Sequence, residues 1–365
     1  MKVGIIGYAR SGKTTVFNAL TGSQAAVGAF GSRDANVAVI KVPDERVDRL
    51  TEVFHPKKKT YAEVQFVDVA PNEAAGDEKA LDMAALTLLK NVDALVHVVR
   101  AFKNEEVVHP CGSVDPVRDC RTLVEELELC DLLVIEKRLE RLKKENRKDS
   151  EHAMLTRCRE HIESAAPLCS LTLSAQEQND IAGFGFLSLK PLMALGNYGD
   201  ESIGSPDPSG LAAYAAEAGT TLTVGSDDDL RNGTVIDLCG AMEMEVAELP
   251  EGERAAFRAE LGLGEESRTR FLHAAYSMLG LITFLTVSSP EVRAWTIPKG
   301  TKALDAAGVV HTDFKRGFIR AEVVKYSDFA EAGSMAKAKE HGRVRLEGKE
   351  YVVQDGDIIL FRFNV

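Results

Sequence analysis

This 365-residue chain has few cysteines, no long apolar run, and fewer basic than acidic residues. The six cysteines are scattered without Cys-x-x-Cys spacing, which favours reduced thiols in a cytosolic protein over disulfides or a metal cluster. The longest apolar runs, 94–99 and 279–287, end well short of a membrane span. The first residues run straight into a strand pattern, which leaves no room for a signal peptide. We therefore expect a cytoplasmic protein without a membrane partner.

The charge is distributed unevenly along the chain. A formal net charge of −12 argues against non-specific coating of nucleic acid. From Arg293 to Val365, however, 13 Lys and Arg stand against 10 Asp and Glu, so this segment carries +3 and the remainder −15. The C-terminal segment is thus the more favourable place for an anionic partner, although ordinary surface variation explains the charge equally well.

Strand and helix patterns alternate outside residues 123–185, as in a doubly wound, mostly parallel α/β sheet. Strand patterns lie at 3–6, 37–42, 64–69 and 94–99, and helical patterns at 14–20 and 80–90. Strand patterns resume at 190–195 and 221–224, before a helical run that begins near Val235. We assign residues 1–122 and 186–280 to one α/β domain.

Residues 123–185 break this alternation. The stretch 123–165 is dense in Glu, Lys, Arg and Leu, and Ile135, Leu139 and Leu142 lie at helical spacing. The spacing predicts an inserted helical hairpin, coiled-coil-like, which is either a solvated structural arm or a partner-binding arm. Short β-like stretches then dominate residues 281–365 and predict a small α+β domain.

The most specific motif is a glycine-rich loop. Residues 7–14 read Gly-Tyr-Ala-Arg-Ser-Gly-Lys-Thr and fit G-x-x-x-x-G-K-[ST] between a strand and a helix. The glycines permit a tight turn whose N–H groups face phosphate oxygens, and the helix N-terminus adds partial positive charge. The pattern predicts a P-loop NTPase domain of the G-domain type. Its predicted nucleotide-binding residues in this part of the chain are Gly7, Arg10, Ser11, Gly12, Lys13, Thr14 and Thr15.

The loop and a nearby strand together predict a magnesium site. Lys13 supplies a charge for the β- and γ-phosphates, and the Thr14 hydroxyl can ligate Mg²⁺. The apolar strand at 64–68 ends in Asp68, a carboxylate that can hold the ion through water. Water would attack the triphosphate, and catalysis would consist mostly of charge stabilisation by Lys13, the ion and backbone amides.

Several long stretches resemble the YchF family of Obg-like ATPases. In the α/β domain the resemblance lies in the P-loop and at 66–68, 92–100 and 112–116, and it is closer in the last third, at 292–297, 311–314, 317–321 and 353–357. The family implies a ribosome-associated nucleotide hydrolase that prefers ATP to GTP. It also implies a helical arm inserted in a G-type domain, and a C-terminal ubiquitin-like TGS domain at 281–365.

The chain departs from the family pattern at the phosphates. Arg10 stands where the family has an Asn that helps to hold K⁺ in related enzymes, which argues against K⁺ activation. Arg10 could instead stabilise phosphate charge in cis, or remain solvated. Ser32 aligns with the switch I Thr and keeps a hydroxyl for Mg²⁺. Pro71 replaces the switch II Gly and has no N–H for the γ-phosphate, so hydrolysis is slow or lost.

The base-recognition segment leaves the choice of nucleotide open. Asn197-Tyr198-Gly199-Asp200 stands in place of the family's Asn-x-x-Glu. The Asp200 carboxylate could accept both guanine edge donors, but Tyr198 replaces the Lys that packs over guanine in GTPases. Cys239, Gly240 and Ala241 stand where the family closes over the base. The resemblance favours ATP, and the residues also permit GTP.

Two functions are compatible with these observations. The first is a Mg²⁺-dependent ATPase or GTPase that acts on the ribosome or ribosomal RNA through the TGS-like domain, the arm or both, without reading DNA sequence. The second is a scaffold that holds nucleotide with weak or no hydrolysis, which Pro71 favours.

Overall fold

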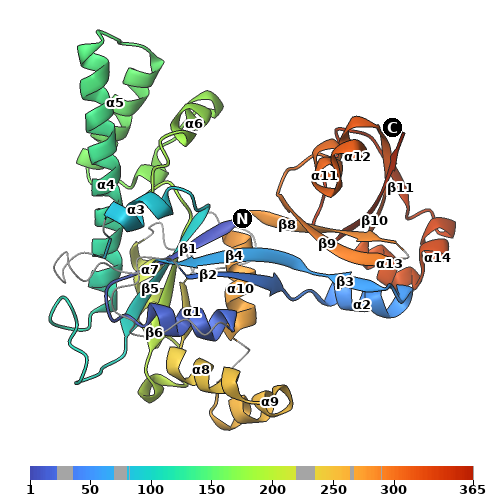
Figure 1. Ribbon diagram of the computed structural model, residues 1–365, viewed down its shortest axis with the longest axis horizontal. Helices are drawn as coiled ribbons and strands as arrows, with labels where there is room; N and C mark the ends of the chain where they lie inside the picture. The colour runs from blue at the N-terminus through green and yellow to red at the C-terminus, as the bar shows by residue number, and fades with distance from the viewer. Residues whose placement is uncertain are drawn as a thin grey trace. The chain divides into compact units, whose positions relative to one another are not determined.

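The structure is a computed structural model, shown as a ribbon in Figure 1. It describes residues 1–22, 36–69, 80–81, 83–218, 235–263, 267–288 and 290–364. The chain forms two compact units, one of Met1–Ala38 with Gln65–Met278 and the other of Val39–Val64 with Leu279–Val365. Within these ranges no helix is both long and apolar enough to cross a membrane.

The first unit is built around a six-stranded sheet. Its strand order is β2 (Asn36–Val42), β4 (Ala62–Asp68), β1 (Lys2–Ile6), β5 (Ala94–Ala101), β6 (Leu192–Tyr198) and β7 (Val235–Leu238). The pairs β4–β1, β1–β5, β5–β6 and β6–β7 are parallel. Parallel strands end at the same edge of a sheet, so the segments that follow β1, β4 and β6 meet there.

Helices cover this sheet, as expected for a parallel sheet whose strands are apolar on both faces. They are α1 (Lys13–Thr21), α3 (Met83–Leu89), α7 (Leu211–Ala218), α8 (Gly240–Glu248), α9 (Glu251–Glu260) and α10 (Ser267–Met278), with the short 3₁₀ helix η3 (Asp200–Ser202). One buried cluster joins Ile6 and Leu95 of the sheet to Leu89 of α3 and to Leu123 and Leu127 of the next helix, α4 (Pro116–Lys144).

The inserted segment forms a helical hairpin (Figure 1). Its elements are α4 (Pro116–Lys144), α5 (Ser150–Glu163), η2 (Leu168–Ser170) and α6 (Ala175–Ala182). Ile135, Leu139 and Leu142, which the helical spacing singled out, share a buried cluster with residues of α5 and α6. The helix begins at Pro116 rather than near residue 123, because the Asp115 carboxylate caps it by accepting the Arg118 N–H.

A buried carboxylate ties the arm back to the sheet. The Asp131 oxygens accept the N–H groups of Leu187 and Ser188, at 2.9 and 2.8 Å, and the Ser188 hydroxyl at 2.6 Å. Burial raises the pKa of Asp131, and these hydrogen bonds oppose that effect. The contact fixes where the chain leaves the arm and enters β6.

The second unit has its own six-stranded sheet. Its order is β11 (Arg345–Glu347), β10 (Phe318–Lys325), β12 (Asp357–Phe363), β8 (Leu281–Val287), β9 (Glu291–Pro298) and β3 (Lys58–Thr60). The helices of this unit are α2 (Glu45–Phe54), α11 (Ala303–Val310), α12 (Thr312–Arg316), α13 (Tyr326–Ala332) and α14 (Met335–Glu340). Phe284, Ile297, Val323 and Phe361 belong to its core.

Two sequence predictions need correction here. Residues 39–64, which we assigned to the α/β domain, group with the second unit apart from the ends of β2 and β4 that pair in the first sheet, because β3 pairs with β9 and Arg46 forms a 2.6 Å ion pair with Asp355. The helical run predicted from Val235 begins with strand β7, whose Ile236 and Leu238 are buried beside β6. The strand predicted at 221–224 lies outside the described residues.

Candidate functional site

The P-loop connects β1 to α1 through a backbone that requires glycine at two points. Gly7 and Gly12 have φ values of +149° and +85°, and Arg10 also has a positive φ of 63°. A Cβ atom on Gly7 would lie 2.4 Å from the Val98 carbonyl oxygen, and one on Gly12 would lie 2.3 Å from Asn197 Nδ2. Any side chain at either glycine would displace the loop, so the spacing of the motif is a steric requirement.

The loop offers its positive groups at one end of the sheet. Lys13 is only 5% exposed, and Gly12 caps α1 without a side-chain hydrogen bond. Burial, and then the nearby Lys13 charge, lower the pKa of His97 to about 3, so the imidazole stays neutral beneath the loop. Thr15 is half-buried in the first turn of α1. A lysine and a helix N-terminus at one place favour a bound phosphate group.

Asp68 lies beside the loop, at the end of β4. The Thr14 hydroxyl donates to Asp68 Oδ2 at 3.2 Å, and Asn36 Nδ2 donates to the same oxygen at 3.2 Å. Asp68 is 2% exposed, and within the described part of the chain its Oδ1 has no hydrogen-bond partner. A buried carboxylate oxygen without a partner suits a cation or its water. Ser32, the third predicted metal ligand, lies outside the described residues, as does Pro71.

Asn197 connects the loop to α8 from the end of β6. Its Nδ2 donates to the Ser11 carbonyl oxygen at 3.0 Å, and its Oδ1 accepts the Gly240 N–H at 3.0 Å. A Cβ atom on Gly240 would lie 2.9 Å from the same Oδ1. Ser11 is itself buried. The amide therefore fixes the two segments to each other, a role that the sequence comparison with base-reading motifs did not reveal.

The other predicted base-site residues lie near this corner. Asp200 is exposed in η3, where its Oδ1 accepts the Glu201 N–H at 3.1 Å. Cys239 is buried at the N-terminus of α8; burial raises the pKa of its thiol, and the Asp200 charge adds to the effect. Ala241 is exposed on α8. The structure thus brings Asp200 and Cys239 together and leaves the Asp200 carboxylate open to solvent.

Arg10 extends from the loop toward the segment after β5. It is exposed, and its Nη1 donates to the Val108 carbonyl oxygen at 3.4 Å, a long contact. Arg100 is buried on β5. Its burial lowers the pKa of its guanidinium, and the positive charge of Arg10 lowers that pKa further.

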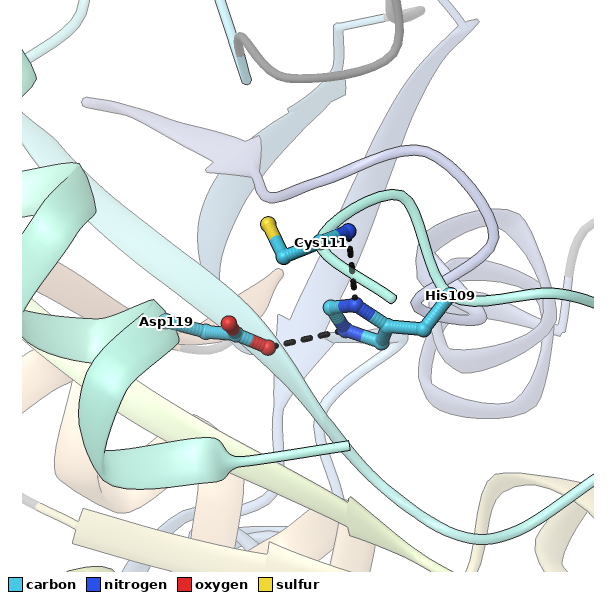
Figure 2. Close-up of side chains that lie close together, drawn as sticks. All are labelled: His109, Cys111 and Asp119. Atoms are coloured by element: carbon cyan, nitrogen blue, oxygen red, sulfur yellow. Dashed lines mark hydrogen bonds and ion pairs between the residues drawn. The ribbon is translucent and has the colours of Figure 1, made fainter. Parts of the chain in front are cut away.

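Sequence reasoning missed a buried cluster next to Val108. Figure 2 shows His109, Cys111 and Asp119, the one group of three possible metal ligands in the described ranges. His109 Nδ1 accepts the Cys111 N–H at 3.1 Å, so the ring proton lies on Nε2, which faces Asp119 Oδ2 at 2.9 Å. Arg118 donates to the other Asp119 oxygen at 2.7 Å. The three residues lie close together in sequence, but they match no ligand spacing that a sequence motif would reveal.

Comparisons with known proteins cover the whole chain. Residues 2–156 match the family described as "50S ribosome-binding GTPase", and residues 281–364 match the C-terminal YchF GTPase family, described as a protein of unknown function. "Ribosome-binding ATPase YchF" of Bacillus subtilis is 41% identical over 100% of both chains. The Escherichia coli O157:H7 protein of that name is 38% identical over 100% of this chain and 99% of its own length. The Schizosaccharomyces pombe YchF GTPase structure superposes with a TM-score of 0.83 at 30% identity, covering 99% of this chain and 97% of that chain.

The two hydrogen bonds of Asn197, to Ser11 and to Gly240, can be tested by mutation. Asn197→Ala should weaken triphosphate binding about tenfold or more, because an unpaired buried donor and acceptor each cost about 1–3 kcal/mol. Titration with a fluorescent ATP analogue measures the affinity. Asn91→Ala is the matched control, since Asn91 is exposed and its Nδ2 makes one long contact, 3.4 Å to the Thr87 carbonyl oxygen. Equal affinities for the two variants would show that the bridge does not shape the site.

Proposed function

This chain belongs to the YchF family, and from that premise we propose that it binds a purine nucleoside triphosphate with Mg²⁺, hydrolyses it and acts on the ribosome. Curated relatives that match the whole chain carry the name ribosome-binding ATPase. The observation that carries the proposal is the contact of Thr14 with Asp68, at 3.2 Å, beside a P-loop whose glycines are sterically required.

The residues present fit a magnesium ion. The Thr14 hydroxyl donates its hydrogen bond to Asp68, so the lone pairs of its oxygen remain available to a cation. Asp68 Oδ1 is buried without a hydrogen-bond partner in the described part of the chain. Thr14 would ligate Mg²⁺ directly, Asp68 would hold it through water, and Ser32 would add a hydroxyl. The ion would neutralise charge on the β- and γ-phosphates.

The chain's own residues would stabilise the charge that develops as water attacks. Lys13 and the loop amides face the phosphates, and the N-terminus of α1 contributes partial positive charge. Arg10 is exposed, and among the described residues its side chain makes one long contact, 3.4 Å to the Val108 carbonyl oxygen, so it could turn toward the phosphates and act in cis. Arg10 stands at the position where related enzymes have an Asn that helps to hold K⁺, so we propose hydrolysis without K⁺ activation.

ATP is the proposed substrate, by family membership. The geometry allows GTP as well, since the Asp200 carboxylate is exposed near the Cys239 corner and could accept guanine N1 and N2 donors. Asn197 cannot use both of its amide atoms on a base while it holds Ser11 and Gly240. The alternative function is a nucleotide-dependent scaffold, favoured by Pro71, which has no N–H to offer the γ-phosphate.

Single-turnover hydrolysis separates the enzyme from the scaffold. With enzyme in excess over labelled ATP or GTP, we expect Mg²⁺-dependent phosphate release, faster with ATP. Arg10→Ala should slow this release about tenfold or more, as loss of one charge-stabilising donor typically does. Lys103→Ala, which removes an exposed cation of the segment after β5, should leave the rate unchanged. Release no faster than in nucleotide alone would leave only the scaffold.

Ribosomal RNA is the proposed partner of the C-terminal unit. Three candidate cations there already have carboxylate partners: Lys315 with Asp305, Arg343 with Asp328 and Arg345 with Glu347, at 2.8, 3.6 and 3.1 Å. Exposed ion pairs contribute only about 0–1 kcal/mol, so Lys315 and Arg343 can exchange carboxylate for phosphate. Arg345 is half-buried and also donates to the Tyr351 hydroxyl at 3.0 Å, so it is the more tightly held of the three. The alternative is that the helical arm, rather than the C-terminal unit, contacts the ribosomal RNA.

A salt series of ribosome co-sedimentation distinguishes the two surfaces. Phosphate contacts release counterions, so changing Lys315, Arg316, Arg343 and Arg345 to Gln should weaken binding and flatten its salt dependence. The matched variant changes four exposed arm cations to Gln: Lys137, Lys143, Lys144 and Lys148. If only the arm variant alters the salt slope, the RNA contact belongs to the arm.

A further inference from the structure

One residue of the P-loop points away from the phosphates and contacts the arm helix. Tyr8 is 2% exposed, and its hydroxyl donates to Glu126 Oε1 at 3.2 Å. Glu126 lies in the first half of α4, and the other carboxylate oxygen, Oε2, accepts the Ala80 N–H at 3.2 Å. Glu126 thus holds two segments at once, and one of them is the nucleotide loop itself.

The residues around this contact are buried and pack against one another. Tyr8 and Ala80 are buried in the same cluster as Leu123 and Leu127, which flank Glu126 on α4. Burial, and next the Glu126 charge, raise the pKa of Tyr8, so the phenol stays protonated and remains the donor. At 3.2 Å the contact is longer than a typical O–H···O hydrogen bond, so the packing of these buried residues as well as the hydrogen bond holds Tyr8 against α4.

The helix that carries Glu126 continues without a break into the arm. α4 spans Pro116–Lys144, and its second half supplies Ile135, Leu139 and Leu142 to the arm's own core. Because α4 is one continuous helix, a displacement at Glu126 would also displace the part of the helix that lies in the arm. Tyr8 directly follows Gly7, where the loop turns, and rearrangement of the loop around a triphosphate therefore moves one end of the contact.

We propose that Glu126 is a positioning residue through which the Tyr8 hydroxyl links the occupied phosphate loop to the arm. This inference rests on the proposed nucleotide binding and adds a route by which a bound triphosphate changes the arm. The link differs from the Asp131 anchor, which holds the exit from the arm through the N–H groups of Leu187 and Ser188.

Hydrogen–deuterium exchange of the full chain tests the link. Exchange is measured with and without a saturating non-hydrolysable ATP analogue and Mg²⁺, in peptides of the P-loop and of residues 135–163. In the unaltered protein the analogue should slow exchange in the loop and change it in the arm. Tyr8→Phe removes only the hydroxyl, so the loop should still respond to the analogue while the arm response falls to less than about a third, because such a hydrogen bond is equivalent to about tenfold in an equilibrium.

Two further variants separate the link from a general packing effect. Tyr214→Phe changes a phenol whose ring centroid lies 5.7 Å from the guanidinium carbon of Arg121 on the same helix, and it should keep the full arm response. Glu126→Leu should also reduce the arm response, since it removes both carboxylate oxygens, the acceptors of the Tyr8 hydroxyl and the Ala80 N–H. A lost hydrogen bond with a merely structural role would change exchange equally with and without the analogue.

The outcomes are distinct. An unchanged arm response in Tyr8→Phe, or no arm response in the unaltered protein whose loop is protected, would overturn the link and leave nucleotide binding intact. Loss of loop protection in Tyr8→Phe at saturating analogue would also overturn it, because Tyr8 would then belong to the nucleotide site itself. Absence of loop protection in the unaltered protein would overturn the proposed nucleotide binding and the link together.

Discussion

The hydrogen bond between Thr14 and Asp68 is the contact on which the rest of the site depends. It joins the first turn of α1 to the end of β4, two segments that are far apart in sequence but follow neighbouring parallel strands. Because β1, β4 and β6 end at one edge of the sheet, the loop, the carboxylate and Asn197 converge there without any long excursion of the chain. The glycines then let the backbone pass between Val98 and Asn197, where no side chain fits.

The parts of the site that sterics dictate are the parts that the sequence could predict. Gly7, Gly12, Lys13 and Thr14 stand in a motif whose spacing reflects backbone geometry, and Asp68 ends an apolar strand and accepts the Thr14 hydroxyl. The role of Asn197 could not be found in this way. Its strand β6 extends to Tyr198, beyond the apolar run that predicted it, and its partners are 186 and 43 residues away.

Long-range pairing also explains the errors in the fold. Residues 39–64 have ordinary strand and helix patterns, and only the pairing of β3 with β9 and the ion pair of Arg46 with Asp355 assign them to the C-terminal unit. Val235 begins a strand because β6 offers it a neighbour, which no local pattern encodes. The contact of Tyr8 with Glu126 joins residues 118 positions apart, so a residue at a variable position of the P-loop motif acquired a role that the motif does not describe.

The central claim is that Thr14 and Asp68 hold Mg²⁺ for a bound triphosphate, and the magnesium dependence of ATP-analogue affinity tests it most directly. Asp68→Asn keeps an oxygen that can accept the Thr14 hydroxyl but removes the negative charge. Our account predicts that the Mg²⁺ concentration needed for tight binding rises about 10–100-fold in this variant, as for loss of an outer-sphere metal partner. Asp93→Asn, a change at an exposed aspartate, should leave it unaltered. The same Mg²⁺ dependence in Asp68→Asn as in the unaltered protein would contradict the account.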